Sequence, residues 1–216
     1  NRDSFESYYA HTLALHYANR PRQALAGVEE LARIRPEDPV TDNTRTFVNI
    51  PLRSNVWASF DWYHDSDSID LYQSRLQGEL RIQPETKLVA GAKYNYQKAD
   101  EGSGLEAVND EGWYSHRVAY AGVNHRFLPS VAVDLTGGYA ETEDKDTFAY
   151  TVGADFRFSD SWRARLERWY DFSLRSPRTT SLGIKEGVNT LQVTWRPDLI
   201  FTIGGFGRYG DLSDDN

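Results

Sequence analysis

The sequence contains neither cysteine nor methionine, and it has no long apolar run among its 216 residues. The lack of cysteine excludes disulfides, thiolate chemistry and cysteine-bound zinc sites. No run reaches the roughly 18 consecutive apolar residues that a transmembrane helix needs, so membrane-spanning helices are excluded as well. A transmembrane β-barrel remains compatible with the sequence, because its strands are short and only half apolar.

A net positive charge is also absent. Asp and Glu number 32 against 24 for Lys and Arg, which gives a net charge of -8. We therefore expect no nucleic-acid partner, since such a partner favours a basic patch. The chain opens at Asn1 with no visible signal peptide, so we expect a mature or truncated piece of a longer protein.

Residues 1–40 have the periodicity of two helices. Apolar side chains recur at helical spacing in two runs, namely Tyr9, Leu13, Tyr17 and then Ala24, Val28, Leu31, Ile34. A turn with a proline opens the second run, and Pro36 and Pro39 end it. This pattern predicts a helical hairpin that looks like one tetratricopeptide-type unit, the last of a longer array. An ordinary amphipathic hairpin is the alternative, because one copy shows no repeat period.

From residue 44 the period changes to two, as in β-strands. Apolar or small side chains alternate with polar ones over residues 72–82, 88–96, 131–139, 148–158, 162–172, 191–195 and 201–205. Residues 118–126 are ambiguous, because polar groups fall on both parities. These runs reach ~9–14 residues, longer than the ~5–6 of globular sheets and suited to tilted membrane strands.

Aromatic residues and connections strengthen the barrel prediction. Aromatics gather near the strand ends, as in an interfacial girdle: Trp62, Tyr94, Tyr96, Tyr139, Phe158, Trp162, Phe172 and Trp195. Short connections at 51–55, 83–86, 128–130, 159–161 and 197–198 alternate with longer ones at 64–68, 98–112, 141–146 and 176–187. Outer-membrane barrels have short periplasmic turns and long outer loops. We predict a mainly β protein in which residues 44–216 form part of an antiparallel outer-membrane barrel; a soluble β-sheet is the alternative.

The start of this barrel is inconsistent with the helices before it. If the connection at 51–55 is periplasmic, residues 44–50 descend from outside, whereas the helical hairpin should be periplasmic. Either an ascending strand is missing between residues 40 and 44, or Thr44–Ile50 is not a membrane strand. About nine or ten strands are visible, and a bacterial barrel needs an even, closed set. We therefore expect missing segments, both internally and after Asn216.

No catalytic constellation stands out, and we predict no catalytic residues, no metal site and no cofactor. The sequence has no Gly-x-Ser-x-Gly elbow, phosphate loop or His-Glu-x-x-His motif. His64-Asp65-Ser66 and Ser115-His116 bring suitable residue types close, but neighbours on a strand point to opposite faces. An outer-membrane esterase or deacylase remains an alternative.

The best candidate site consists of the polar residues that alternate with apolar ones along the strands. Inside a barrel these residues would face water or each other: Asp61, Gln73, Arg75, Gln77, Glu79, Arg81, Lys93, Asp134, Asp155, Arg157, Arg163, Arg165, Glu167, Trp169 and Asp171. Their mixed signs suit a hydrated path for a polar polymer. The alternative is a self-paired ion network that only fills the lumen. Trp57, Trp169 and Phe206 would stack on sugar rings or simply pack the interior.

The predicted outer loops are acidic. Their carboxylates are Asp100, Glu101, Glu106, Asp110 and Glu111 on one loop and Glu141, Glu143, Asp144 and Asp146 on another. A ring of carboxylates at the mouth favours a cationic or partly cationic passenger. The alternatives are ordinary solvated loops, or contact with lipopolysaccharide through divalent ions.

Several short motifs resemble those of a known family. They are Phe158-Ser159-Asp160-Ser161-Trp162-Arg163, Leu166-Glu167-Arg168, Ser173-Leu174-Arg175, Gly187-Val188, Val193-Thr194-Trp195 and Asp211-Leu212-Ser213-Asp214-Asp215-Asn216. Their order and spacing, after a tetratricopeptide-like unit, resemble the bacterial exopolysaccharide export porins, most of all the poly-N-acetylglucosamine porins. The likeness covers the last third of the chain well and the rest in pattern only.

The resemblance implies an outer-membrane pore, surrounded by lipid, that passes a polysaccharide during biofilm formation. The passenger would be a partly de-N-acetylated glucosamine polymer. The helical part would lie in the periplasm and recruit a deacetylase or guide the polymer. An outer-membrane enzyme and a non-conducting surface receptor are the other functions that the sequence leaves open.

Overall fold

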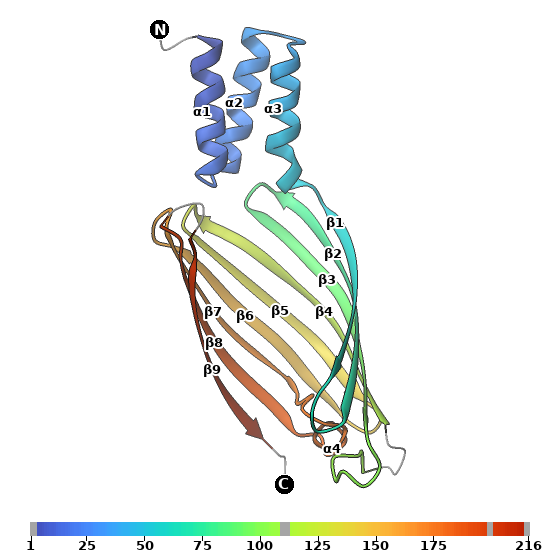
Figure 1. Ribbon diagram of the computed structural model, residues 1–216. Coiled ribbons are helices and arrows are strands. Elements are labelled where there is room, and N and C mark those ends of the chain that lie inside the picture. Colours follow the sequence, from blue (N-terminus) through green and yellow to red (C-terminus); the bar gives the residue numbers. More distant parts are fainter. Residues whose placement is uncertain (1–3, 109–112, 198–200, 214–216) are drawn as a thin grey trace.

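The computed structural model describes residues 4–108, 113–197 and 201–213. Three helices precede a single sheet: α1 (Phe5–Tyr17), α2 (Pro21–Ile34) and α3 (Pro39–Asn49), followed by the short 3₁₀ turn η1 (Ile50–Leu52). Figure 1 shows the three helices packed side by side at one end of the strands. Among the described residues, none of the helices is both long enough and apolar enough to span a membrane.

Local signals start and stop the first two helices. The Ser4 side chain accepts a hydrogen bond from the Ser7 N–H, which caps the start of α1. Pro21 opens α2, where its missing N–H costs no helical bond. Between them, Asn19 has φ 63°, a left-handed conformation that Asn tolerates. The predicted hairpin therefore forms, but its likeness to a tetratricopeptide unit stays a prediction.

Residues 44–49, which we expected in the sheet, lie in α3 instead. Asp38 caps this helix by accepting from the Val40 N–H at 2.8 Å, and Pro39 occupies its first turn. Its buried residues Thr41, Thr44 and Val48 recur at helical spacing, and Val48 packs on α2. The second alternative at this junction is thus the right one: no ascending strand is needed, because the first strand starts at Asn55.

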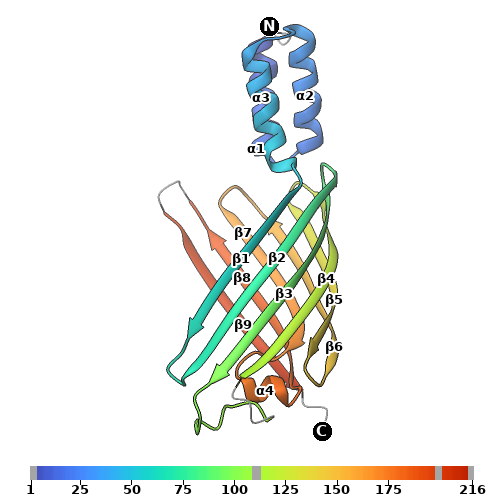
Figure 2. The ribbon, with the colours of Figure 1, turned by 90° about the vertical axis from the view of Figure 1, so that its right-hand side faces the viewer.

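The sheet is an antiparallel meander of nine described strands in sequence order. They are β1 (Asn55–His64), β2 (Ile69–Gln83), β3 (Thr86–Ala99), β4 (Trp113–Leu128), β5 (Val131–Thr142), β6 (Asp146–Arg157), β7 (Trp162–Phe172), β8 (Lys185–Trp195) and β9 (Ile203–Ser213). Figure 2 shows the strands tilted and curved around an open interior. The predicted runs of alternating residues coincide with these strands, although Phe158 lies just after β6 and residues 201–202 lie just before β9. The ambiguous residues 118–126 belong to β4.

The sheet has a polar concave face and an apolar convex face. Large apolar side chains on the convex face are left half exposed, as are Leu76 (55%), Leu80 (56%) and Tyr139 (55%). In a water-soluble sheet such residues would be buried against a second layer. No described element covers this face, and an outward-facing apolar surface of this kind is typical of membrane β-barrels.

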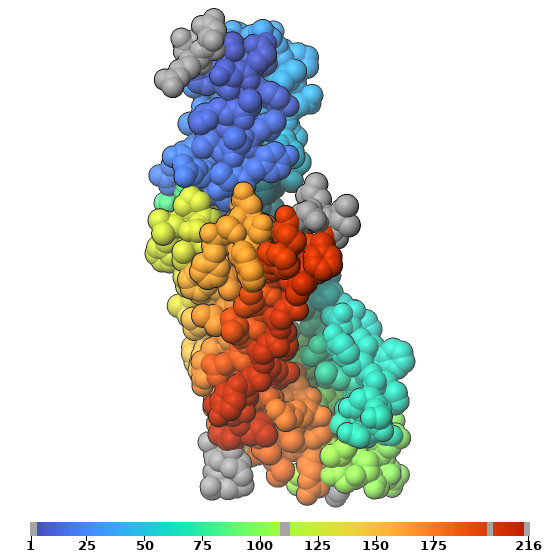
Figure 3. Space-filling view, turned by 60° about the vertical axis from the view of Figure 1, so that its left-hand side comes forward, coloured from blue at the N-terminus to red at the C-terminus, as the bar shows by residue number. Residues whose placement is uncertain are grey.

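The two classes of connection separate to opposite ends, as predicted. The turns at residues 84–85, 129–130 and 158–161 lie at the helix end, while 65–68, 100–108, 143–145 and 173–184 lie at the far end. The helices rest directly on the strand ends in the space-filling view (Figure 3). Arg22 of α2 forms an ion pair with Glu85 at 3.0 Å, and the Asn19 amide donates to the Pro129 carbonyl at 3.4 Å.

The described sheet is not closed. β1 pairs only with β2, and β9 pairs only with β8. Because nine antiparallel strands separate the two edges by an even number of reversals, β1 and β9 run in the same direction. Direct pairing of these edges would therefore be parallel, unlike every other pair in the sheet. The described strands are thus neither even in number nor closed, which agrees with the partial barrel that we expected.

Candidate functional site

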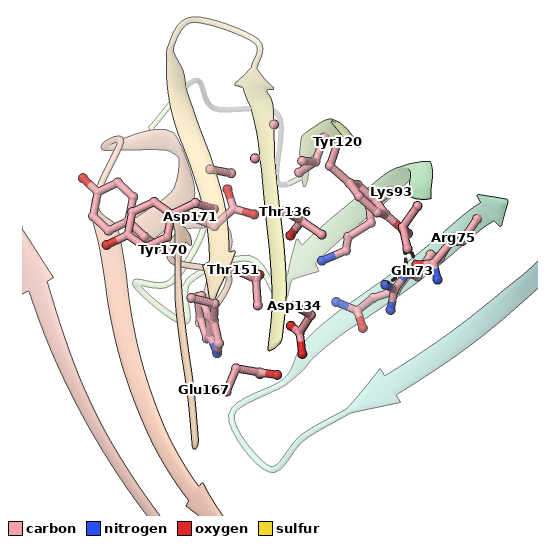
Figure 4. Close-up of a pocket in the computed structure, with 18 of the residues that line it drawn as sticks. Gln73, Arg75, Lys93, Tyr120, Asp134, Thr136, Thr151, Glu167, Tyr170 and Asp171 are labelled. Carbon is pink, nitrogen blue, oxygen red and sulfur yellow. Dashed lines mark hydrogen bonds between the residues drawn. The ribbon is translucent and has the colours of Figure 1, made fainter. Parts of the chain in front are cut away.

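The concave face encloses two neighbouring cavities. The larger, of about 850 Å³, extends along the sheet, and the smaller, of about 680 Å³, lies at the helix end. Predicted path residues on the larger cavity are Asp61, Gln73, Arg75, Gln77, Glu79, Lys93, Asp134, Arg165, Glu167, Trp169 and Asp171. Those on the smaller are Arg81, Asp155, Arg157, Arg163 and again Arg165. Figure 4 shows side chains from separate strands projecting into the larger cavity.

Arg165 is the centre of an ion cluster on one wall. Its guanidinium donates to Asp134 at 3.0 Å, to Asp155 at 2.6 Å and to Glu167 at 2.6 Å. Three carboxylates around one cation leave this wall with a net negative charge. The alternative of a self-paired network thus describes part of the inward set, and the surplus carboxylate charge faces the cavity.

A chain of hydrogen bonds lines the opposite wall. The Arg75 Nε donates to the Tyr120 hydroxyl at 3.0 Å, and that hydroxyl donates to Gln77 at 2.8 Å. Gln77 in turn donates to Glu79 at 3.2 Å, and the Lys87 ammonium lies 2.7 Å from Glu79. Each hydrogen bond satisfies polar groups that are partly removed from water, so the network fixes this wall in one arrangement.

The sequence pattern did not place His116 inside the sheet, although it is buried there. His116 is 1% exposed; its Nδ1 lies 2.9 Å from the Asn95 amide, and its Nε2 lies 3.0 Å from Asp171. β4 had polar residues on both parities, which hid the fact that even residues face inward. Ser115 is on the other parity and donates to Glu143 at 3.5 Å. In the part of the chain that the structure describes, no serine hydroxyl hydrogen bonds to His116, so no nucleophile is paired with it.

The connection at residues 173–184 folds against the far end of the sheet. It carries the short helix α4 (Pro177–Ser181), which starts with a capping box between Ser176 and Thr179. Gln97 of β3 donates to the buried Thr180 hydroxyl at 3.2 Å. Glu186, with 3% of its side chain exposed, binds Arg175 at 2.7 Å and so fastens the base of this connection.

The acidic outer loops also lie at the far end. Asp100, Glu101 and Glu106 are on the connection after β3, Glu141 and Asp146 face each other across β5 and β6, and Glu143 and Asp144 form the turn between them. Asp110 and Glu111 lie outside the described residues. The Gly102 N–H donates a hydrogen bond to the Glu106 carboxylate. Nearby backbone N–H groups, first of all that of Glu106 itself, hold the pKa of this carboxyl below its usual value.

The predicted aromatic girdle forms two bands on the convex face. At the far end Trp62 stacks with Tyr72, and Tyr96 stacks with Trp113 at a 5.3 Å centroid distance. At the helix end Trp162 stacks with Trp195 at 5.8 Å. Phe172 is a correction: it is 1% exposed and packs edge-on against His116, because the chain turns inward as β7 ends.

Comparisons with known proteins support the fold. No protein-family model matches the chain, and no curated protein sequence matches it. A solved structure of a bacterial polysaccharide outer-membrane secretin is similar over 74% of this chain and 50% of that chain, with 16% identity and a TM-score of 0.53. Two others are the KdgM porin in complex with disordered oligogalacturonate (74% and 89% covered, 8% identity, TM-score 0.42) and the siderophore receptor PirA from Pseudomonas aeruginosa (74% and 35%, 16%, 0.47).

At these identities the likeness concerns the fold alone. The nine-stranded meander has the architecture of an outer-membrane β-barrel sheet, and this chain spans half the length of the secretin.

Proposed function

We propose that this protein is part of an outer-membrane pore that guides a secreted polysaccharide across the bacterial outer membrane. One observation carries the proposal: the concave face is polar and bears two cavities, while the convex face is apolar and banded with aromatics. The apolar convex face suits contact with the hydrocarbon of the bilayer, and the polar concave face suits a hydrated path for a polar polymer. The role is transport and not catalysis.

The passenger that best fits the far end is a partly de-N-acetylated poly-N-acetylglucosamine for biofilm matrix. Its free amines are cationic, and the far-end loops and the Arg165 wall both carry surplus carboxylates. Trp169 on the larger cavity offers a ring face to sugars. Weak contacts repeated along the wall would let a chain enter and still leave.

The helices would lie on the periplasmic side, because the short turns are at their end of the sheet. In this position α1–α3 would meet the polymer before it reaches the lumen. A periplasmic deacetylase is the partner that we propose for their exposed surface. Deleting the helices should then leave the pore intact and lower the efficiency of export.

The first test is single-channel conductance of the full-length parent in a planar bilayer. Cationic glucosamine oligomers should block the current, and neutral N-acetylglucosamine oligomers should block it less. A silent but heat-modifiable barrel would contradict the pore and favour a plugged receptor or an enzyme. Failure to insert would revive the soluble sheet.

A variant links the block to the lumen. Asp61 has no ion-pair partner among the described residues, and Asp134 shares Arg165 with two other carboxylates, so Asp61→Asn with Asp134→Asn leaves Arg165 partnered. We expect the block by cationic oligomers to weaken about threefold to tenfold. Glu30→Gln, on the exposed surface of α2, is the matched control and should change nothing.

A further inference from the structure

The smaller cavity differs in charge from the rest of the lumen. It lies between the α1–α2 turn and the helix end of the sheet, with Tyr17 and Asn19 on its helical side. Six cationic side chains line it, against two carboxylates, Glu85 and Asp155. The cations are Arg81, Lys87, Arg126, Arg157, Arg163 and Arg165. A concave site lined by one sign of charge concentrates ions of the other sign.

The two carboxylates are already engaged by other arginines. Glu85 pairs with Arg22 at 3.0 Å, and Asp155 pairs with Arg165 at 2.6 Å. Within the described residues, Arg126 and Arg163 therefore have no carboxylate at ion-pair distance and no side-chain hydrogen-bond acceptor. Two guanidinium groups from separate strands are left free to bind an anion.

A third arginine is held in place but incompletely satisfied. Arg81 donates to the Pro51 carbonyl at 2.9 Å and to the Pro84 carbonyl at 3.2 Å, which fixes its guanidinium at the cavity wall. Its Nε is buried and has no hydrogen-bond partner in the described part of the chain. A buried donor without an acceptor costs free energy, so an anion that accepted a hydrogen bond from the Arg81 Nε would remove this cost.

We infer that this cavity binds the acidic groups of a polysaccharide, either carboxylates or ester-linked phosphates or sulfates. The guanidinium fork matches the geometry of these groups. A sugar chain is the source that fits, because Lys87, Asn124 and Arg165 line both cavities and make the smaller one continuous with the proposed path. Its volume of about 680 Å³ suits a few sugar units, and Tyr17 gives them a ring face.

This inference rests on the proposed pore and changes its passenger, because partly de-N-acetylated poly-N-acetylglucosamine carries no acidic groups and the cavity would require them in addition to the amines. A chain with only cationic units would be repelled by Arg126 and Arg163 at the helix end, whereas it would be attracted by the carboxylates at the far end. A passenger with acidic groups alongside its amines would be bound at both ends. The cavity would act first, as the site that selects the polymer before it enters the lumen.

The test is calorimetric binding to the full-length protein in lipid nanodiscs. Galacturonate oligomers should bind, and the double variant Arg126→Gln with Arg163→Gln should lower their affinity about tenfold. Arg33→Gln, an exposed arginine on α2, is the control and should bind as the unmodified protein does. Raising the salt from about 50 to about 500 mM should weaken binding further. If the double variant folds poorly, Arg163→Gln alone serves, because Arg163 is exposed.

Four outcomes would overturn the inference. Equal binding by the double variant would remove the arginines from the site. Neutral N-acetylglucosamine oligomers that bind as tightly would make charge irrelevant. Inorganic phosphate that binds as tightly would indicate a small-anion site, and a poly-glutamate peptide that binds more tightly would indicate an acidic protein partner. A silent pore that still binds galacturonate would refute the proposed function and leave the acidic-sugar site standing.

Discussion

At the scale of single residues, the lumen is organised by a few side chains with several partners. Arg165 holds three carboxylates, and Tyr120 joins Arg75 to Gln77. Sequence alternation correctly placed Arg165 and its carboxylates on one face. It gave no sign of which charges would meet, because partners such as Asp134 and Arg165 are on strands that are not neighbours in the sheet.

Replacing Arg165 with Met should destabilise the sheet by about 1–3 kcal/mol, because three half-buried carboxylates lose their shared cation. Urea unfolding in lipid vesicles measures this loss. Arg117→Gln is the control: its 3.7 Å pair with Glu141 is exposed, at 62% and 46%, and should contribute under about 0.5 kcal/mol. If adding Asp134→Asn to Arg165→Met restores no stability, repulsion among the carboxylates is not the cause.

At the scale of elements, parity and turn chemistry account for the strands, while the helices depend on closer contacts. α1 and α2 approach closely at Gly27, which faces the fully buried Thr12. A Cβ at Gly27 would lie 3.1 Å from the Thr12 Cβ and overlap its hydroxyl. The prediction that residues 44–49 belong to the sheet was wrong at this scale. This short β-branched run is helical in α3, because its cap and its packing on α2 outweigh strand propensity.

Gly27→Leu should therefore force α1 and α2 apart and destabilise the helical unit by about 1–3 kcal/mol. Circular dichroism at 222 nm during thermal unfolding would show an early loss of helix, while the β signal persists to the temperature of the unmodified protein. Ala26→Leu adds the same side chain on the exposed side of α2 and should have little effect. Simultaneous loss of helix and sheet would mean that the two unfold as one unit.

At the scale of the whole molecule, the helices are attached to the mouth of the sheet through polar contacts. Arg22–Glu85, Asn19–Pro129 and the Arg157 bond to the Tyr17 carbonyl at 3.3 Å join them. The outer edges of β1 and β9, which face away from β2 and β8, have no strand neighbour among the described residues. Because a bilayer interior offers no hydrogen bonds, both edges need further partners in a membrane.

The absence of cysteine makes this attachment easy to test. Arg22→Cys with Glu85→Cys should be joined efficiently by a short bismaleimide, since the native side chains are 3.0 Å apart. Arg33→Cys with Glu85→Cys is the control, because Arg33 lies about 16 Å farther along α2. Equal cross-linking of both pairs would show that the helices do not rest on the sheet as a fixed unit.

The sequence by itself determined which side of the strands faces the interior, except in β4, as well as which connections are long and where most of the aromatic bands lie. These features depend on a period of two and on turn residues, which are local. Only the tertiary structure decided the Arg165 cluster, the His116–Asp171 contact, the inward turn of Phe172 and the arginine cavity beneath the helices. Each of these joins residues far apart in the chain, and their meeting depends on the register and curvature of the whole sheet.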